Sequence, residues 1–409
     1  MTRHHPGQRD EHANTSHAQS PALRRDYDAT MSATHREPPW AHLGMKDVFL
    51  RLAQSGSEQL FWINSTTALS PGGHNGPYFD VETPVRNSAH WLASMSIAYS
   101  LTGDKNFRRS GEALTRFLLS SLMKIAGVHV HRQRFPKDWT NGVIGPAWVS
   151  EGLMLAGRHL DIDVATRAGA DLLRGLGFDE ERSLWQASDP ATDSRGTDRT
   201  VNHQVFCTAI AAEFNQDSVL RSRVDRFIEN SLGVIVRTGQ DGVLQHHVPM
   251  SLAQRLAHRA FTAARNRTGA RFRRAAMRHG SVPDAALRDV GYHVFSLYSI
   301  SRLAAARPSA QLAMIPEVRA AASAVTSIIS APHYPDNPYG YAYNPVGFEL
   351  PAIVSTPGFE GIVSDEVVAD AYRLQMDQTS EPDTGLLTRS TLDPLVLSAR
   401  GYELGLLYA

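Results

Sequence analysis

The chain has 409 residues, of which 42% are hydrophobic, and its 41 Lys and Arg balance its 41 Asp and Glu. A neutral balance gives no electrostatic support for nucleic-acid binding, and the hydrophobic fraction is ordinary for a soluble globular protein. The single cysteine, Cys207, excludes an intramolecular disulfide framework and fits a reducing compartment. Because no apolar run approaches the roughly 20 residues that cross a bilayer, and no secretory signal opens the chain, we expect a cytoplasmic protein.

Residues 1–38 are polar and lack the apolar side chains that offset the entropy of ordering, so we predict a disordered tail. Residues 39–409 are predicted to form one domain that is helical almost throughout. The predicted helices cover 46–58, 85–101, 106–125, 143–159, 163–176, 201–213, 218–238, 290–305, 316–330, 348–354, 363–376 and 394–408. Short strand signals occur at 128–131 and 243–248.

The predicted helices alternate between two kinds. Helices of the first kind are rich in Ala, Gly, Ser and aromatic residues and begin with a polar cluster, as in NSAHWLASMSIAYSL. Helices of the second kind are amphipathic, with Arg and Glu on one face, as in FRRSGEALTRFLLSSL. We therefore expect the first kind to be buried on nearly all sides and the second kind to form an outer layer.

The spacing of the polar clusters predicts the architecture. The clusters fall near Asp80, Trp139, Arg199, Val290, Asn344 and Asp393, at intervals of about 59, 60, 91, 54 and 49 residues. The long interval contains a segment of about 30 residues that looks inserted, and its removal restores an interval of about 60. Six units of one inner and one outer helix predict an all-α (α/α)6 toroid, whose inner helix ends line a central cleft.

The inserted segment, residues 252–282, carries eight Arg between Arg255 and Arg278 and no acidic residue. A solvated surface excursion is one interpretation. The alternative is a basic amphipathic helix that makes weak peripheral contact with a membrane or with an acidic or lipid-linked saccharide.

The stretch HNGPYFDVETPVRNSAHW, residues 74–91, predicts the rim of a functional site. Gly76 and Pro77 exclude a helix in its first half, and Asp80 or Thr83 is the predicted N-cap of the helix in its second half. The stretch brings together acids, bases, amides and aromatic rings: His74, Asn75, Tyr78, Asp80, Glu82, Arg86, Asn87 and His90. An elaborate helix cap, with Asp80 and Glu82 serving the helix dipole, is the alternative.

Four further inner helices begin with polar clusters of their own. These are residues 137–142 with Trp148 and Glu151 beyond them, 198–204, 289–293, and 341–349. Single residues of these clusters also have purely structural interpretations. Asp198 or Asp289 could be a helix N-cap, and His203 could be a hydrogen-bonded core residue. Their recurrence at successive helix starts favours a saccharide site, because rings stack on sugar C–H faces and amides and carboxylates bind hydroxyl groups.

The blocks HNGPYFDVETPVRNSAHW, DWTNGVIGPAWVSEGL, DRTVNHQVF, GYHVFSLY and NPVGFE resemble the AglQ-like proteins of bacterial polysaccharide clusters. The layout is more distantly similar to the six-hairpin glycosidase and glucosamine-epimerase toroids. The resemblance covers about residues 75–349 and implies a carbohydrate substrate, without fixing the reaction.

Three functions follow as hypotheses. The first is a glycoside hydrolase or transferase with a pair of carboxyl groups, drawn from Asp80, Glu82, Asp138, Glu151 and Glu349, with Asp138 and Glu349 preferred. The second is a sugar epimerase or lyase that uses His203 and His293 as bases, with Arg86 or Arg199 holding a uronate carboxylate. The third is a non-catalytic carbohydrate-binding or scaffold protein.

The predicted substrate-binding residues are His74, Asn75, Tyr78, Arg86, His90, Trp139, Asn141, Glu151, Arg199, Asn202, Tyr292 and Asn344. The expected partner is an oligosaccharide or polysaccharide, with no nucleic acid. No cofactor and no metal ion are predicted.

Overall fold

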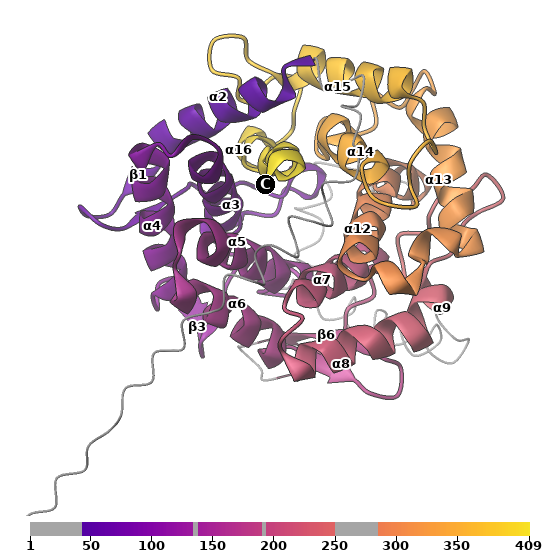
Figure 1. Cartoon of the computed structure of the whole chain (residues 1–409), viewed down its shortest axis with the longest axis horizontal. Helices are drawn as coiled ribbons and strands as arrows, with labels where there is room; N and C mark the ends of the chain where they lie inside the picture. The colour runs from indigo at the N-terminus through magenta and orange to yellow at the C-terminus, as the bar shows by residue number, and fades with distance from the viewer. Residues whose placement is uncertain (1–42, 134–137, 190–193, 250–284) are drawn as a thin grey trace, which may run out of the picture.

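The structure is a computed structural model that describes residues 43–133, 138–189, 194–249 and 285–409. The predicted tail and the predicted insertion at 252–282 lie outside the described residues. In the described part of the chain, helices form two concentric layers around one axis (Figure 1). This arrangement is the predicted (α/α)6 toroid.

The inner layer consists of α3 (Val85–Thr102), α5 (Ile144–Leu160), α7 (Val201–Glu213), α12 (His293–Ala306), α14 (Val346–Val354) and the pair α16 (Pro394–Ala399) and α17 (Tyr402–Gly405). The outer layer consists of α2 (Met45–Glu58), α4 (Lys105–Leu119), α6 (Asp163–Gly175), α8 (Ser218–Phe227), α13 (Pro316–Ile329) and α15 (Asp365–Thr379). Short helical pieces connect them: η2 (Gly76–Tyr78), η3 (Ile228–Leu232), α9 (Gly233–Ile235), α11 (Ala285–Gly291), η5 (Pro308–Ala310) and η6 (Leu312–Met314). A last piece, η7 (Leu406–Tyr408), follows α17.

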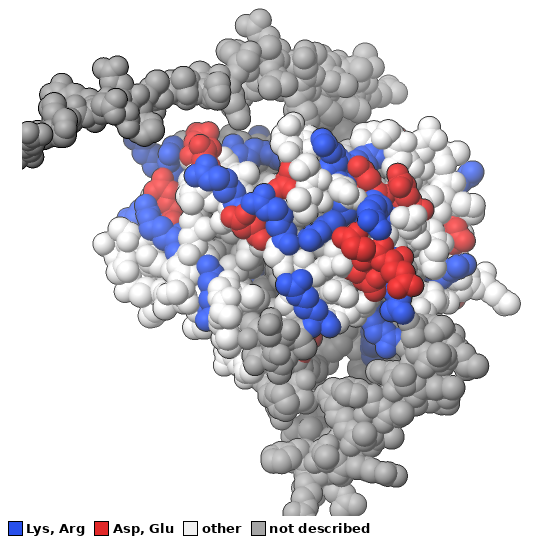
Figure 2. Space-filling view, turned by 90° about the horizontal axis from the view of Figure 1, so that it is seen from below, with Lys and Arg blue, Asp and Glu red and all other residues white. Residues whose placement is uncertain are grey.

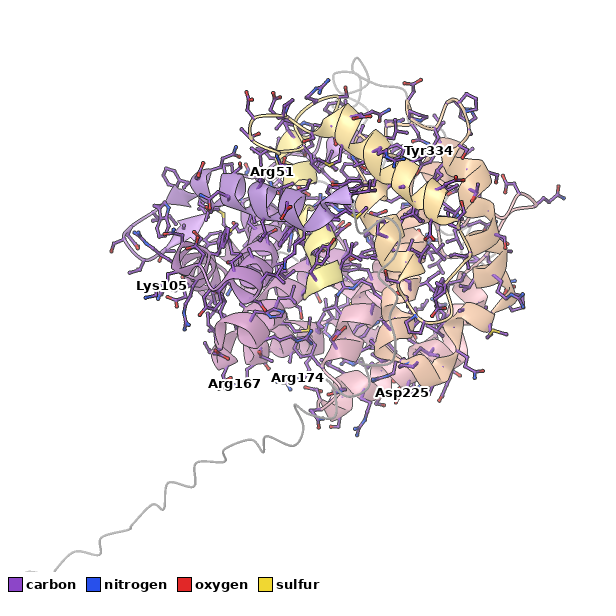
Figure 3. The ribbon with its side chains drawn as sticks, turned by 45° about the horizontal axis from the view of Figure 1, so that its top comes forward. Arg51, Lys105, Arg167, Arg174, Asp225 and Tyr334 are labelled. Carbon is purple, nitrogen blue, oxygen red and sulfur yellow. The ribbon has the colours of Figure 1, made fainter. Side chains whose placement is uncertain are left out.

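The two layers bury their helices differently, as the sequence predicts. Inner helix α3 is buried without interruption from Val85 to Ala98, and its serines and alanines let neighbouring helices approach closely. Outer helix α4 buries one face, which includes Phe107 and Leu114, and exposes Arg116. Charged side chains of the outer helices, such as Lys105 and Asp225, lie on the outside of the ring (Figure 3).

The last inner unit closes the ring on the first. Helices α16 and α17 pack against α2 and α3. The carboxylate of Asp393 accepts hydrogen bonds from the backbone N–H groups of Val396 (3.3 Å), at the start of α16, and of His74 (2.8 Å) and Gly76 (3.2 Å). One side chain therefore caps the final helix and holds the loop that leads into α3.

In the described part of the chain, three small sheets lie between the helices. They are the hairpin of β1 (Phe61–Trp62) and β2 (Ala68–Leu69), the hairpin of β3 (Lys124–Ile125) and β4 (Val128–His129), and the antiparallel sheet of β5 (Gly177–Asp179), β6 (Leu184–Asp189) and β7 (Ser194–Thr197). In the last sheet Phe178 pairs with Trp185, and Gln186 pairs with Thr197. The β3–β4 hairpin confirms the strand signal at 128–131 for its first two residues, whereas the β1–β2 hairpin and the three-stranded sheet were not predicted.

Several predicted boundaries are wrong. The helix predicted over 106–125 ends at Leu119, because Ser120 adopts an extended backbone and its hydroxyl group donates to the carbonyl of Phe117. The helix predicted over 218–238 is divided into α8, η3 and α9. The strand predicted over 243–248 forms only the isolated bridges Thr238–Leu244 and Thr200–His247.

The face of the ring seen in Figure 2 carries basic and acidic side chains side by side. This pattern is consistent with ion pairs on the outer layer, for example those of Arg174 with Asp171 and with Asp217. Among the described residues, no single helix has the length and apolarity that crossing a bilayer requires. By length and composition alone, the bent pair Pro308–Met314 and Pro316–Ile329 meets that requirement.

Candidate functional site

The candidate site is a cavity of about 260 Å³ that receives side chains from all the inner units. Most of these side chains come from loops that precede the inner helices or from the first turns of those helices. The lining residues are Asn75, Tyr78, Arg86, Arg132, Asp138, Asn141, Ile144, Trp148, Thr200, Asn202, His203, His246, His247, Arg288, Tyr292, Phe295, Tyr343, Asn344 and Arg400.

His203 and Asp198 form a hydrogen-bonded pair at the start of α7. His203 Nδ1 lies 2.9 Å from Asp198 Oδ2, and the carboxylate also accepts the backbone N–H groups of Thr200 and Val143, each at 2.9 Å. Burial alone would raise the pKa of Asp198, but the electrostatic interaction with His203 and these hydrogen bonds hold this pKa below its ordinary value. An ionised carboxylate on Nδ1 fixes the orientation of the ring and leaves Nε2 as the nitrogen available to a ligand.

The turn before α5 is built around this pair. Asn141 and Gly142 both adopt left-handed backbone conformations, with φ of 58° and 65°, and Gly142 N–H donates to Asp138 Oδ1 at 2.6 Å. A Cβ atom on Gly142 would lie 2.0 Å from Asp198 Oδ2 and 2.9 Å from His203 Nδ1. Glycine is therefore required at this position both by the backbone and by the approach of the pair.

Arg86 also lines the cavity, where several neighbouring side chains hold its guanidinium in place. Its guanidinium lies 4.2 Å from the ring centre of Trp148 and donates hydrogen bonds to Asn75 (3.0 Å) and to the carboxylate of Glu82 (3.3 Å). The hydroxyl group of Tyr343 donates to the same Asn75 oxygen at 2.6 Å. These contacts hold an amide, a phenol and an indole ring in place before any ligand binds.

His246 and Asn202 present buried polar groups that are not paired. Burial lowers the pKa of His246 to about 2, so its ring is neutral at physiological pH, and its centre lies 4.6 Å from that of Tyr292. His246 Nδ1 and both polar side-chain atoms of Asn202 are buried without a hydrogen-bond partner among the described residues. Because buried polar groups are nearly always satisfied, we expect a ligand or ordered water to bind them.

The structure does not bring the predicted pair of catalytic carboxyl groups together. Asp138 lines the cavity, where it accepts a hydrogen bond from Arg132 at 2.9 Å. Glu349 is fully buried and paired with Arg400 at 2.6 Å, away from the lining. Glu82 and Glu151 are likewise buried in ion pairs, with Arg86 and Arg302 respectively, and Asp80 is buried in the rim loop.

His293, the other predicted base, has a structural role. Its Nδ1 accepts the backbone N–H group of Leu244 at 3.1 Å, and its Nε2 donates to the carbonyl of Ala321 at 3.0 Å. Both ring nitrogens are used by the backbone, and burial lowers the pKa of His293 to about 4. The adjacent Tyr292 lines the cavity instead.

Half of the predicted site residues line the cavity. They are Asn75, Tyr78, Arg86, Asp138, Asn141, Asn202, His203, Tyr292 and Asn344. The predicted residues outside the lining are His74, Asp80, Glu82, His90, Trp139, Glu151, Arg199, His293 and Glu349. His90, for example, is stacked on the ring of Tyr402 and packs against the ring of Trp148 in an edge-to-face arrangement, outside the cavity lining.

The sequence-based interpretation missed several lining residues, including His246, His247, Arg288 and Arg400. Loop 243–248 carries the two histidines across the cavity, because Val201 N–H donates to the carbonyl of His246 at 2.9 Å and His247 is bridged to Thr200. The tandem histidines after a strand-like run were a signal that could have identified this loop. Arg400 lies in the middle of a predicted helix and gave no such signal.

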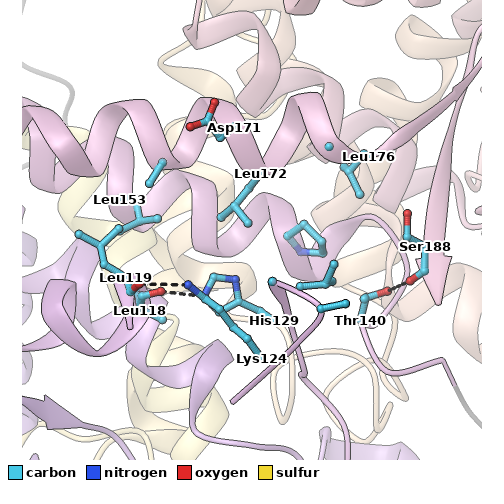
Figure 4. A pocket seen from close by; sticks show the side chains of 16 residues that line it. Leu118, Leu119, Lys124, His129, Thr140, Leu153, Asp171, Leu172, Leu176 and Ser188 are labelled. Atoms are coloured by element: carbon cyan, nitrogen blue, oxygen red, sulfur yellow. Dashed lines mark hydrogen bonds between the residues drawn. The ribbon is translucent and has the colours of Figure 1, made fainter. Parts of the chain in front are cut away.

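A second hollow, of about 350 Å³, lies between α4, α5, α6 and the β3–β4 hairpin (Figure 4). Five of its sixteen lining residues are leucines, His129 Nε2 binds the Leu118 carbonyl at 2.9 Å, and Lys124 donates to the Leu119 carbonyl at 3.3 Å. In its described lining a single polar side-chain atom, His129 Nδ1, is buried without a partner. The smaller central cavity, with its unpaired polar groups, is therefore the better candidate for a functional site. Among the described residues, no group of three or more His, Cys, Asp or Glu is suited to a metal ion.

No protein-family model matches the chain. Among curated proteins, archaeal glycosylation protein Q of Haloferax volcanii is 31% identical over 368 residues, which cover 88% of this chain and 96% of that protein. Among solved structures, a D-mannose isomerase has a TM-score of 0.60 at 10% identity, covering 91% of this chain and 99% of the other.

Two further solved structures share the fold at similarly low identity. For cellobiose 2-epimerase of Bacillus thermoamylovorans the TM-score is 0.55 at 11% identity, with 90% and 99% of the two chains covered. For an α-1,6-mannanase of Salegentibacter it is 0.53 at 8% identity, with 88% and 98% covered.

Proposed function

Because the chain belongs to the family of archaeal glycosylation protein Q, we propose that it acts on a saccharide bound in the central cavity and transfers a proton at a sugar carbon. The observation that carries this proposal is the pairing of His203 with Asp198 beside the unpaired polar groups of Asn202 and His246. The fold shared with a mannose isomerase and a cellobiose 2-epimerase is consistent with it, as an analogy of architecture.

The proposed step requires one base and one neutral hydrogen-bond donor. The sugar lies with the carbon next to its carbonyl group facing His203, and Nε2 takes the proton from that carbon. The C–H electron pair moves toward the carbonyl oxygen, and an enediolate forms. Return of the proton to the neighbouring carbon, with transfer of the hydroxyl proton between the two oxygens, isomerises the sugar. Epimerisation instead requires a second proton donor on the other face of the same carbon.

The surrounding residues supply electrostatic support for this step. The Asp198 carboxylate stabilises the imidazolium that forms on His203. The neutral imidazole of His246 acts as a hydrogen-bond donor to the sugar oxygen, a role that suits a histidine whose pKa is far below 7. The aromatic rings of Trp148 and Tyr292 provide apolar surface for the sugar ring.

The geometry gives less support to hydrolysis by two carboxyl groups. Such a mechanism needs two carboxyl groups on either side of one bond, separated by roughly 5–10 Å. Of the five predicted carboxyl groups, Asp138 alone lines the cavity, and it is paired with Arg132. Two alternatives to the proposal therefore remain. One is a hydrolase of this class, and the other is a protein that binds carbohydrate without turnover.

The test is incubation of the purified protein with a panel of mono- and oligosaccharides in D2O, followed by mass spectrometry and NMR. We expect solvent deuterium at one sugar carbon, with the rate reduced roughly 10²- to 10⁴-fold by His203→Asn and lowered by Asp198→Asn. The matched control is His333→Asn, since His333 is exposed, and this variant should keep the parent rate.

Release of reducing ends without deuterium incorporation would instead support the hydrolase. Saccharide binding without any turnover would support the non-catalytic alternative. A cytoplasmic location, and weak contact of residues 252–282 with a membrane or a lipid-linked saccharide, remain predictions from the sequence.

A further inference from the structure

Among the described residues, four arginines line the central cavity, and three of them are paired with acidic side chains. Arg86 is paired with Glu82 at 3.3 Å, and Arg132 is paired with Asp138 at 2.9 Å. Arg400 is paired with Glu349 at 2.6 Å and with Glu403 at 2.9 Å. These three guanidinium groups are held by the protein, so none of them is free to bind a charged ligand without giving up its partner.

Arg288, on α11, has no such partner among the described residues. Its Nη1 donates a hydrogen bond to His247 Nε2 at 3.3 Å, and its Nε is buried without a partner. Its guanidinium also interacts with Tyr339, another neutral side chain. Asp289 follows it in the sequence, but the Asp289 carboxylate accepts the backbone N–H group of His246 at 2.9 Å instead.

The positive charge of Arg288 acts inside the cavity. Burial is the main cause that lowers the pKa of His247, and the charge of Arg288 lowers this pKa further. The same charge contributes to the low pKa of His246. Both histidines line the cavity together with Arg288, so a ligand there meets a guanidinium that forms no hydrogen-bonded ion pair among the described residues, although its charge also acts on the Asp289 carboxylate.

We infer that the sugar bound in the central cavity carries an acidic group, a carboxylate or a phosphate, and that the guanidinium of Arg288 binds it. A guanidinium offers parallel N–H donors that match the two oxygens of such a group, and the pair is strongest where water is excluded. The inference rests on the proposed function, because it names the class of sugar that the same cavity takes. In this inference Arg288 takes the role of binding a sugar carboxylate, which the sequence had suggested for Arg86 or Arg199.

The test measures binding to the full-length protein by calorimetry, with matched acidic and neutral sugars at constant ionic strength. The acidic probes are glucuronate, galacturonate, mannuronate and glucose 6-phosphate, and the neutral probes are glucose, galactose and mannose. We expect at least one acidic sugar to bind roughly ten- to a hundredfold more tightly than its neutral counterpart, the range of a charge-assisted hydrogen bond. The preferred probe also distinguishes a carboxylate from a phosphate.

Variants then locate the effect. Arg288→Gln should remove the preference for the acidic sugar and leave the affinity for the neutral sugar within about twofold of the parent value. Arg288→Lys keeps the positive charge and should therefore keep part of the preference for the acidic sugar. The control is Arg158→Gln, because Arg158 is paired with Glu213 in an exposed ion pair and should not affect either affinity. Unchanged melting temperatures would establish that the variants are folded.

Two results would overturn the inference and leave the proposed function standing. One is equal affinity for acidic and neutral sugars in the parent protein. The other is a preference for the acidic sugar that survives in Arg288→Gln. If no sugar of either kind binds, the proposed function fails, and the inference fails with it.

Discussion

The histidines of this protein carry out different tasks according to the partners of their ring nitrogens. His203 shares one nitrogen with a carboxylate and lies in the cavity. His293 uses both nitrogens on backbone groups, and His129 uses Nε2 on the carbonyl of Leu118; both are buried. Burial lowers the pKa of His129 and of His293 to about 4, so both are neutral in the fold.

This assignment predicts a pH dependence of stability. The folded pKa of His293, about 4, lies below its ordinary value of 6.5, so protonation favours the unfolded chain. The contribution of neutral His293 is complete above pH 6.5 and is lost as the pH falls toward 4. The difference of about 2.5 units corresponds to at most on the order of 3 kcal/mol.

In His293→Gln this contribution disappears, because glutamine does not titrate. We expect the melting temperature of the variant to fall less steeply between pH 6.5 and pH 4 than that of the parent, by calorimetry at matched ionic strength. The other buried histidines titrate equally in both proteins, so the difference isolates His293. Identical slopes would contradict a neutral, buried His293.

At the scale of residues, the sequence predicted which helix starts carry polar groups but not which way each group faces. Glu349 and its partner Arg400 are 51 positions apart, and Glu151 and Arg302 are 151 positions apart. Only the fold brings these charges together, and each pair removes a predicted catalytic carboxylate from the cavity. His203, which was predicted from the polar cluster at the start of an inner helix, lies in the cavity lining, and its partner Asp198 is five positions away.

Among the elements, the turns before the inner helices position the site. The turn at Gly142 brings the backbone of the α5 unit against the Asp198–His203 pair of the α7 unit. Helices were predictable here because the apolar runs are long. Capping did not mark their starts: α3 begins after Pro84, not at the predicted caps Asp80 or Thr83, and α5, α7, α12 and α14 likewise have no side-chain cap hydrogen bond. The sheet of β5, β6 and β7 was not predictable, because its strands have three, six and four residues and lack a clear alternating pattern.

Gly142→Ala should destabilise the protein by more than the backbone strain alone. An alanine at φ of 65° costs about 1–2 kcal/mol, and its Cβ would also displace Asp198. The control is Gly127→Ala, where φ is 81° but nothing lies within 4 Å of the added Cβ.

We expect Gly142→Ala to lower the free energy of unfolding more than Gly127→Ala, and to lower turnover as well, while Gly127→Ala changes stability alone. The measurements are urea denaturation and deuterium incorporation. Equal losses of stability, with turnover intact in both variants, would show that the pair does not depend on this turn.

For the whole molecule, the ring explains why residues from every unit meet at one place. The regular spacing of about 60 residues was sufficient to predict the toroid, because each unit contributes one inner and one outer helix. The spacing could not reveal that Asp393 holds the rim loop at His74 and Gly76, since this contact joins residues 319 and 317 positions apart.

The Arg-rich segment 252–282 lies outside the described residues, and its role stays a prediction from the sequence. Eight arginines without an acid could contribute about 1 kcal/mol each near an anionic surface. We expect weak association with anionic liposomes that high salt reverses, and a fold that survives deletion of the segment. Equal co-sedimentation of the parent and the deleted form at low salt would leave only a solvated surface excursion.

The central claim is that the cavity at the ring centre binds the saccharide with a reacting carbon at His203. The most direct measurement is a crystal structure of the Asp198→Asn variant with the sugar identified by the binding panel. We expect the sugar in this cavity, with a carbon next to its carbonyl group roughly 3–3.5 Å from His203 Nε2. A sugar bound in the apolar hollow beside α6, or in the cavity with no carbon near His203, would contradict the claim.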